Sequence, residues 1–432
     1  MSLRVATFQS DATPPLGTPL CFGGCKPALR IVDPLSVRGV VLLPENDAPV
    51  VLCAVDWVGI AGASHDRWRE QLAGAAGTTA DRVAVHCLHQ HDTPGASQDA
   101  ASLSAECGLT NGSLDPDLEN RIIALAADTL RESLNHAIAI THLAVGMARV
   151  NRFASNRRIL GPDGKVEYTR WSACVDEAVR ARSEGIIDPF LRLISFWADT
   201  TPVASLTYYA THPQSFYRRG AVSADTVGLA RSLREATVPE AAHIHFNGAG
   251  GNVTAGKYND GSPQNRLRLA RRLAQGMEEA WDTSIKIPVT SGMLEWRVKS
   301  VALPASPLIP DEETLLLRLK TPKADMDHMT RAISFLRRIK SGHKFDLTCL
   351  RLGPAFVLHM PGELFVEYQL AAQALRPNEM VCMAAYGDYC MGYIGTRAAY
   401  DQGGYETKPG TSKVGPDVED VLMNAIRDLL KS

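Results

Sequence analysis

The sequence predicts an α/β protein in which mixed β-sheets are flanked by helices in layers, forming a single large domain over residues 1–432. Three observations lead to this prediction. Short strand-like runs alternate with amphipathic helical runs along most of the chain. Hydrophobic residues make up 45% and charged residues 21%, as is typical of globular proteins. No low-complexity linker or short repeat divides the chain, which favours one mixed unit over two separable domains.

The individual elements follow from the spacing of apolar residues. Strands are predicted at 37–43, 48–56, 82–91, 140–150, 190–198, 203–212, 242–248, 285–303, 345–353, 355–362 and 380–387. Helices are predicted at 64–77, 118–137, 224–236, 266–281, 325–340, 365–375 and 416–430. A long loop with one short helix is predicted for residues 151–186. The strands at 345–353 and 355–362 are predicted to pair as a hairpin.

Composition excludes several classes of protein. The net charge is −2 and the pI is about 6.6, so no basic field exists to bind nucleic acid. No apolar run approaches the roughly 18 residues that span a bilayer, and the N-terminal residues have no apolar core of a signal peptide. Nine scattered cysteines indicate reduced thiols and a cytoplasmic location. The expected partner is a small molecule. The oligomeric state stays open, with a symmetric homodimer as one option.

The segment HCLHQHDTPG concentrates three of the chain's 12 histidines. If residues 82–91 form a strand, His89 and His91 share one face and His86 points the other way. Two adjacent imidazoles can bind one metal ion, or one can bind the ion while the other handles a proton. The alternative is a set of surface or hydrogen-bonded histidines.

Four further segments contain residues suited to chemistry, and each also has a structural explanation. His212 ends an apolar strand before Pro213, where a histidine is often structural. Glu363 follows a strand and a Pro-Gly pair at the start of a helix, a position that the helix dipole alone favours for glutamate. The turn HFNGAGGNVTAG (245–256) predicts exposed backbone N–H groups suited to an oxyanion or phosphate. Residues 387–406 place four tyrosines in a glycine-rich segment, as proton donors or as packing.

Taken together and in this order, these segments resemble the neutral ceramidases and their bacterial relatives over most of the chain. HQHDTP stands where that family has an HTHSGP-like segment, and THPQS matches its strand ending in His-Pro. GNVTAG stands in place of a GDVSPN-like turn, and PGE matches a Pro-x-Glu segment. Tyr393 and Tyr405 keep the family's tyrosine spacing, and VNR at 150–152 matches an Asn-Arg pair that supplies an active-site arginine.

The resemblance implies a hydrolase that binds one Zn²⁺ ion per chain and cleaves a linear amide bond through a metal-activated water. The implied metal ligands are His89, His212 and Glu363, with Tyr393 as the fourth. This is a catalytic type of ligand set, because it leaves room for water. The implied catalytic residues are His91, Arg152, Tyr393 and Tyr405, and the implied substrate-binding residues are Gly251, Asn252 and Thr254. Asp225 is predicted either to orient a metal ligand or to cap a helix.

Three departures from the family pattern bear on the substrate. Asn252 and Thr254 replace an Asp and a Ser of the family turn, so Thr254 is assigned to substrate contact and not to nucleophilic attack. The family's additional C-terminal immunoglobulin-like domain is not predicted here, and neither is an export signal. No basic amphipathic helix suited to a membrane surface is found. We therefore expect a small polar N-acyl substrate, with ceramide-like lipid as the second choice.

Two other classes of function stay open. The same ligands would serve a metal-dependent lactonase, esterase or sugar isomerase, and a non-catalytic member would bind a small molecule. The loop 155–186 is the expected determinant of specificity. If Arg157, Arg158 and Arg170 face the metal together with Trp171, the substrate is expected to carry a carboxylate or phosphate. The alternative is that this loop is an ordered surface excursion.

Overall fold

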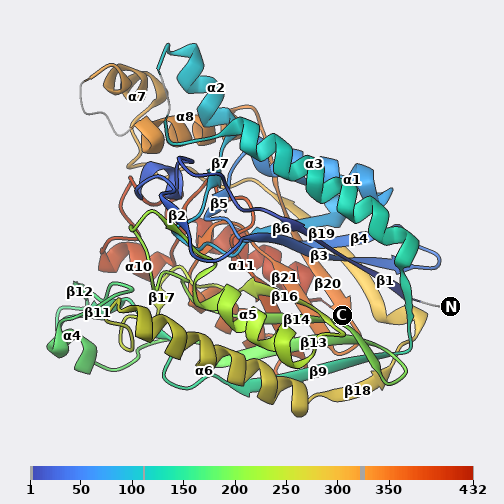
Figure 1. Ribbon diagram of the computed structural model, residues 1–432. Coiled ribbons are helices and arrows are strands. Elements are labelled where there is room, and N and C mark those ends of the chain that lie inside the picture. The colour runs from blue at the N-terminus through green and yellow to red at the C-terminus, as the bar shows by residue number, and fades with distance from the viewer. Residues whose placement is uncertain (1–2, 110–111, 322–325, 432) are drawn as a thin grey trace.

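Three large β-sheets form the centre of the computed structural model, which describes residues 3–109, 112–321 and 326–431 (Figure 1). The first sheet has the order β6-β4-β3-β1-β8, the second β16-β14-β13-β9-β18 and the third β19-β20-β21-β23. Their strands are β1 (Leu3–Asp11), β3 (Ser36–Pro44), β4 (Val50–Val55), β6 (Val83–Cys87), β8 (Ile138–Ile140), β9 (His142–Arg149), β13 (Phe190–Ala198), β14 (Thr201–Tyr209), β16 (Ala242–Asn247), β18 (Ile285–Pro288), β19 (Leu294–Val301), β20 (Phe345–Leu352), β21 (Ala355–His359) and β23 (Met380–Ala384).

Each large sheet is mixed and contains one parallel pair. These pairs are β4 with β6, β14 with β16, and β21 with β23. The other neighbouring strands in these sheets run antiparallel. Parallel strands end at a common edge, and ligand sites form at the carboxyl ends of such strands. The loops that leave these three pairs carry most of the candidate site residues.

Helices cover the outer faces of the sheets. α1 (Ala63–Ala76) and α3 (Pro116–Ser133) pack on the first sheet, whereas α5 (Asp225–Thr237) and α6 (Pro263–Asp282) pack on the second, on the opposite side of the molecule (Figure 1). α9 (Val366–Ala374) and α11 (Val418–Leu429) pack against the third sheet. The predicted architecture of layered mixed sheets and helices is therefore confirmed.

The sequence of β3 shows why the first sheet is buried on both faces. Alternate side chains of a strand point to opposite faces of its sheet. Val37 and Val41 enter one apolar core with the helices α1 and α3, and Val40 and Leu42 enter a second core shared with the second sheet. The near-continuous apolar run of this strand therefore matches its place between two layers.

Most of the remaining elements are short, and several of them had no counterpart in the sequence prediction. They are the helices α2 (Gln98–Glu106), α4 (Glu177–Ala181), α7 (Glu312–Leu319), α8 (Met326–Lys340) and α10 (Arg397–Gln402), and the strands β2 (Arg30–Ile31), β5 (Gly59–Ile60), β7 (Gly95–Ala96), β10 (Ser155–Asn156), β11 (Arg158–Leu160), β12 (Val166–Thr169), β15 (Ala221–Val222), β17 (Val253–Thr254), β22 (Glu363–Leu364) and β24 (Tyr393–Ile394). The predicted hairpin is confirmed as β20 and β21. Residue 325, the start of the helix predicted at 325–340, lies outside the described residues.

The structure also bears on the cysteines and on membrane-spanning helices. All nine cysteines are free thiols, so the sequence pattern was correctly interpreted as no disulfide framework. Within the part of the chain that the structure describes, no helix is both long enough and apolar enough to cross a membrane.

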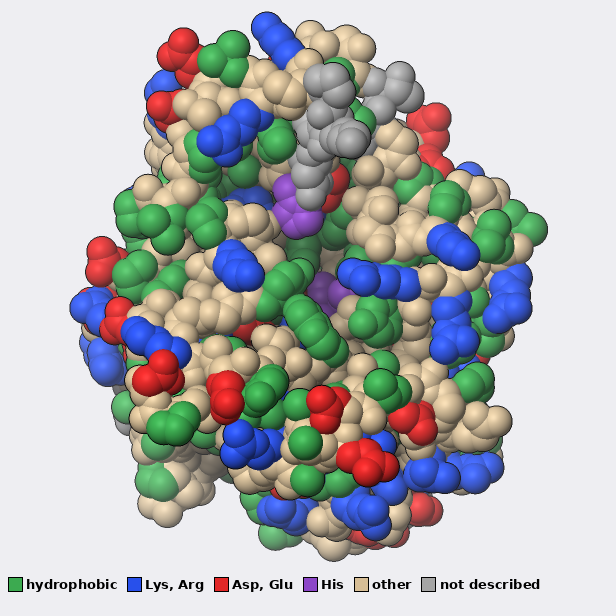
Figure 2. Space-filling model, turned by 90° about the vertical axis from the view of Figure 1, so that its left-hand side faces the viewer, with side chains coloured by type: hydrophobic (Ala, Val, Ile, Leu, Met, Phe, Trp, Pro, Cys, Tyr) green, Lys and Arg blue, Asp and Glu red, His purple; other side chains and the backbone are tan. Residues whose placement is uncertain are grey.

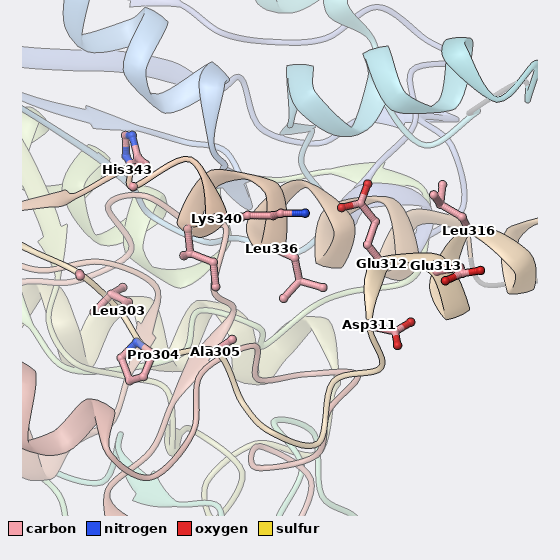
Figure 3. A pocket seen from close by; sticks show the side chains of 13 residues that line it. Leu303, Pro304, Ala305, Asp311, Glu312, Glu313, Leu316, Leu336, Lys340 and His343 are labelled. Atoms are coloured by element: carbon pink, nitrogen blue, oxygen red, sulfur yellow. The ribbon is translucent and has the colours of Figure 1, made fainter.

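A groove of about 1020 Å³ lies between α7, α8 and the segment after β19 (Figure 3). Leu303, Leu316 and Leu336 contribute apolar side chains to it, and acidic side chains of α7 and its N-cap stand at one end. It contains none of the candidate site residues named from the sequence.

A buried carboxyl group in α3 makes the stability of the fold depend on pH. Glu119 is 3% exposed and accepts a hydrogen bond of 3.0 Å from the Ser64 hydroxyl. Burial raises the pKa of Glu119 from 4.5 to about 7. The folded state therefore holds this proton more tightly than the unfolded chain does. The resulting stabilisation is complete below pH 4.5 and is lost as the pH rises through 7.

We expect Glu119→Gln to unfold at the same urea concentration as the wild type at pH 4. At pH 8 the variant should be more stable by about 2 kcal/mol, since it has no charge to bury. Urea titrations at both pH values measure this difference. Identical pH profiles for the two proteins would contradict the assignment.

Candidate metal centre

Three histidines from two loops form the middle of the site. One ring nitrogen from each of His89, His91 and His212 lies within 4.8 Å of the other two, so the group could hold a metal ion. His89 and His212 are buried, whereas His91 is partly exposed. On the face of the molecule shown in Figure 2, the surface is hollowed at its centre, and a histidine side chain is visible inside the hollow.

His89 is positioned by a loop and not by a strand, which corrects the strand predicted for residues 82–91. β6 ends at Cys87, and His89 has a left-handed φ of 63°. Its backbone N–H donates to the Trp57 carbonyl at 2.9 Å, and its Nδ1 lies 2.5 Å from the Val58 carbonyl oxygen. Since a carbonyl only accepts, Nδ1 carries the proton. In the neutral ring the lone pair of Nε2 is then available to a ligand.

His86 faces away from this loop, as predicted, although it lies on β6 itself. Its Nδ1 donates to the Ala385 carbonyl at 2.9 Å, and its ring meets Phe246 edge-on. Burial lowers its pKa to about 3, so the ring stays neutral. The side chain belongs to the packing between sheets.

Three buried ligand atoms face one another without hydrogen-bond partners among the described residues. They are His89 Nε2, His212 Nδ1 and Glu363 Oε2. Glu363 Oε2 lies 3.4 Å from His89 Nε2 and 3.6 Å from His212 Nδ1. A buried polar atom without a partner is costly, so three of them at one point call for an occupant. Two imidazoles and one carboxylate are the donor set that suits a catalytic zinc ion.

Glu363 is placed by the parallel pairing of β22 with β24 across from Tyr393. The Tyr389 hydroxyl donates to Glu363 Oε1 at 2.5 Å, which orients the carboxylate and leaves Oε2 directed at the histidines. Burial acts to raise the pKa of Glu363, but the neighbouring His89 and the hydrogen bond donated by Tyr389 lower it below its usual value. The carboxylate is therefore ionised at neutral pH.

The Tyr393 hydroxyl lies at the junction between the histidines and a buried arginine. Its ring stacks on His212 with an interplanar angle of 4°, and its oxygen accepts a 2.9 Å hydrogen bond from Arg157 Nη1. Burial raises the pKa of Tyr393 well above its usual value, although Arg157 opposes the shift. Tyr405 contacts the Tyr393 ring edge-on at a centroid distance of 5.8 Å.

The structure places Arg157 beside Tyr393, whereas Arg152, the arginine named from the sequence, lies on the surface. Arg152 is exposed, and its carbonyl accepts a hydrogen bond from Arg272 on the surface of α6. Arg157 is 2% exposed, and its Nε lies 3.3 Å from a carboxylate oxygen of Glu406. The segment NRFASNRR contains two Asn-Arg pairs. The second pair begins in β10, which pairs with β17 and so is carried into the centre.

His91 links the two buried histidines to the loop 155–186. Its Nε2 lies 2.9 Å from His212 Nε2, and its Nδ1 lies 3.0 Å from Gln214 Nε2. Gln214 in turn accepts a 2.8 Å hydrogen bond from the Ser172 hydroxyl. Cys21 Sγ is 3.4 Å from the same Nδ1. Gln214 and Cys21 were missed by sequence reasoning, although Gln214 is only two residues from His212.

Several N–H groups of the glycine-rich turn, those of Gly248, Ala249 and Gly251, are bonded within the protein. Gly251 donates its N–H to the Leu364 carbonyl at 2.8 Å, and a Cβ at this position would lie 2.2 Å from the Glu363 carbonyl oxygen. The Asn252 side chain donates to Glu367 and accepts from the Val366 N–H. Gly251 and Asn252 therefore hold the Glu363 segment in place, and the structure does not direct these groups at a substrate.

Thr254 and Asp225 have different surroundings. Thr254 forms a bridge with His212, and its buried hydroxyl has no hydrogen-bond partner in the described residues. Asp225 begins α5 and accepts hydrogen bonds from the Ser215 N–H at 2.9 Å and from the Ser215 hydroxyl. It also accepts from the following backbone N–H. Asp225 thus braces the loop that carries His212, and within the described residues it makes no hydrogen bond or ion pair with the histidine itself.

Of the loop arginines named from the sequence, Arg157 is the one that contacts Tyr393. Arg158 binds Glu406 at 3.0 Å, and Arg170 donates to the Ser183 carbonyl at 2.8 Å, so both are engaged within the protein. Trp171 is 45% exposed, and its ring meets Tyr405 edge-on.

Comparison with solved structures shows the fold of this chain. The neutral ceramidase from Pseudomonas aeruginosa aligns with a TM-score of 0.73 and 15% sequence identity, over 99% of this chain and 74% of that chain. A ceramidase complexed with C2 gives the same TM-score and identity, over 99% of this chain and 75% of that chain. No protein-family model and no curated protein matches the sequence. The chain has the fold of the neutral ceramidases, as the resemblance of its sequence segments predicts.

Proposed function

We propose that this chain is a zinc-dependent amidohydrolase that cleaves a linear amide bond with water. The proposed substrate is a small polar N-acyl compound, with ceramide-like lipid as the second choice. The observation that carries the proposal is the set of partnerless atoms His89 Nε2, His212 Nδ1 and Glu363 Oε2 in one buried site. The fold shared with ceramidases supports an amide as the bond that is cleaved.

The proposed zinc ligands are His89, His212 and Glu363, with Tyr393 as the fourth. Zinc at this point would activate a water molecule and polarise the carbonyl group of the substrate. The Val58 carbonyl fixes the tautomer of His89, and Tyr389 orients the carboxylate of Glu363. Such outer contacts set the direction of metal ligands.

His91 is proposed to carry the proton that passes to the leaving amine. It is the partly exposed histidine of the three, and burial lowers its pKa well below the usual value. A neutral imidazole at neutral pH can accept a proton and then donate it. The contact with Gln214 holds its ring in place.

Arg157 takes the role first assigned to Arg152. Its guanidinium would stabilise negative charge developing at the carbonyl oxygen, acting through Tyr393. Tyr405 is proposed to position the substrate beside this pair. The unpartnered hydroxyl of Thr254 is proposed to contact the substrate, whereas Gly251 and Asn252 hold the backbone around Glu363. Asp225 is proposed to keep the His212 loop in position.

Release of a primary amine from a panel of N-acyl compounds tests this function. The zinc-loaded protein is incubated with N-acetyl amino acids, a short N-acyl sphingoid base, and the ester and lactone counterparts, and products are identified by mass spectrometry. We expect the amides to be hydrolysed, with the polar N-acyl compounds turned over fastest. Hydrolysis of esters or lactones alone, or no hydrolysis of any compound, would contradict the proposal.

A further inference from the structure

The buried arginines around the histidine site already have partners within the protein. Arg157 and Arg158 share the carboxylate of Glu406, at 3.3 Å and 3.0 Å. Arg170 donates to the carbonyl oxygen of Ser183. An anionic group of a substrate would have to displace these internal partners. The surroundings of these arginines therefore do not support the expectation that the loop 155–186 binds an anionic group of the substrate.

Arg218 differs from these arginines in both exposure and partners. Its side chain is exposed, and no ion pair or side-chain hydrogen bond engages its guanidinium in the described parts of the chain. Its guanidinium carbon lies 5.6 Å from the centroid of the Tyr217 ring. An arginine in this state can offer its full set of planar donors to a carboxylate.

Tyr217, which precedes Arg218 in the chain, lies beside His91, the partly exposed histidine of the site. The ring of Tyr217 meets the His91 ring edge-on at a centroid distance of 5.9 Å. The Arg218 guanidinium faces this same Tyr217 ring, so one side chain separates it from His91. Figure 2 shows Lys or Arg side chains beside the hollow that exposes a histidine.

The backbone at Arg218 is held in an unusual conformation by the residue that follows His91. Arg218 has a left-handed φ of 63°, which non-glycine residues seldom adopt. The N–H groups of Arg218 and Arg219 donate to the two carboxylate oxygens of Asp92, at 3.0 Å and 3.2 Å. Asp92 is buried. The segment 91–92 thus carries the histidine and also holds the backbone at Arg218 in place.

We propose that Arg218 binds a carboxylate group of the substrate at the mouth of the histidine site, so that the preferred substrates are N-acyl amino acids. This inference rests on the proposed hydrolase function. The guanidinium would receive the carboxylate by paired N–H donors while the amide group lies at the histidines. Substrates without the anion would lack this contact and bind more weakly.

Steady-state kinetics on matched substrates test the proposal. N-acetylglycine, N-acetyl-β-alanine and N-acetyl-4-aminobutyrate vary the distance from the amide to the carboxylate, and the corresponding carboxamides lack the charge. For the wild type we expect kcat/KM of the best acid to exceed that of its carboxamide by at least about 10-fold. Arg218→Gln should remove this preference by raising KM for the acid while leaving kcat and the carboxamide unchanged. Arg218→Lys should keep part of it.

Arg219→Gln is the matched control. The Arg219 guanidinium lies 4.7 Å from the Phe216 ring centroid and donates to the Gly261 carbonyl, so it is engaged within the protein. We expect this variant to keep the preference for acids. Equal effects of the Arg218 and Arg219 substitutions, or a wild type that turns over acid and carboxamide equally, would overturn the proposal.

A binding measurement separates this inference from the hydrolase function itself. N-acetylglycine and its carboxamide are titrated by calorimetry into the metal-free wild type and Arg218→Gln. Tighter binding of the acid, lost in Arg218→Gln, supports the carboxylate site even if no amide is hydrolysed. Turnover of amides without any acid preference would leave the hydrolase standing and remove only the role of Arg218.

Discussion

Glu363→Gln is expected to lower amide hydrolysis by at least about 10³-fold and to weaken zinc binding. The substitution removes the one anionic ligand and places an amide beside His89 and His212, where the carboxylate oxygen now lies 3.4 Å and 3.6 Å from their nitrogens. The amide oxygen can still accept from Tyr389, so the fold around it should persist. Amine release and zinc affinity measured on the same preparation check both parts.

Glu367→Gln is the control for this change. Glu367 lies four residues further on in α9, and its carboxylate accepts a hydrogen bond from Asn252 that a glutamine oxygen can also accept. We expect this variant to keep its zinc and its activity within about threefold. Retention of full activity by Glu363→Gln would remove Glu363 from the proposed ligand set.

Arg157→Gln should reduce both stability and activity, whereas Arg152→Gln should change neither. Arg157 is buried against Glu406, and removing one partner of a buried ion pair costs about 3 kcal/mol. Arg158 continues to bind Glu406, which limits the loss. Tyr393 loses its hydrogen-bond donor, so kcat should fall by about 10²-fold.

Urea unfolding and kcat of the two arginine variants provide the comparison. Arg152 is exposed and lies outside the site, so its variant controls for the loss of one positive charge. Loss of activity in Arg152→Gln with none in Arg157→Gln would restore the original sequence assignment and contradict the placement of β10 beside β17.

The layers of the fold could be predicted because the local patterns that specify them are strong. β3 and β4 are apolar runs, and α6 repeats apolar residues at helical spacing, although it begins at Pro263, before the predicted start at residue 266. The short strands in residues 151–186 and the helix α7 could not be predicted in this way. Their side chains are largely polar or exposed, so their structure depends on pairing with distant segments, as β10 does with β17.

The site was harder to predict because loop geometry, not strand alternation, brings its residues together. The sequence prediction placed His89 and His91 together on one face of a strand over residues 82–91. This reason is wrong, because β6 ends at Cys87. The prediction that they lie together is confirmed because the Trp57 and Val58 carbonyls fold the loop back. Likewise, the glycines of the turn 248–251 are needed for close backbone packing, as the contact of Gly251 with Glu363 shows. A sequence pattern cannot distinguish that need from anion binding.

Zinc content of the purified chain tests the central claim most directly, with His89→Asn and His86→Asn as a matched pair. An asparagine amide can replace the Nδ1 donor that each histidine directs at a carbonyl, of Val58 and of Ala385, but it cannot replace Nε2. We predict about one zinc ion per chain in the wild type and in His86→Asn, and none in His89→Asn. Equal zinc content in the two variants, or no zinc in any of the three proteins after zinc is supplied, would contradict the metal centre.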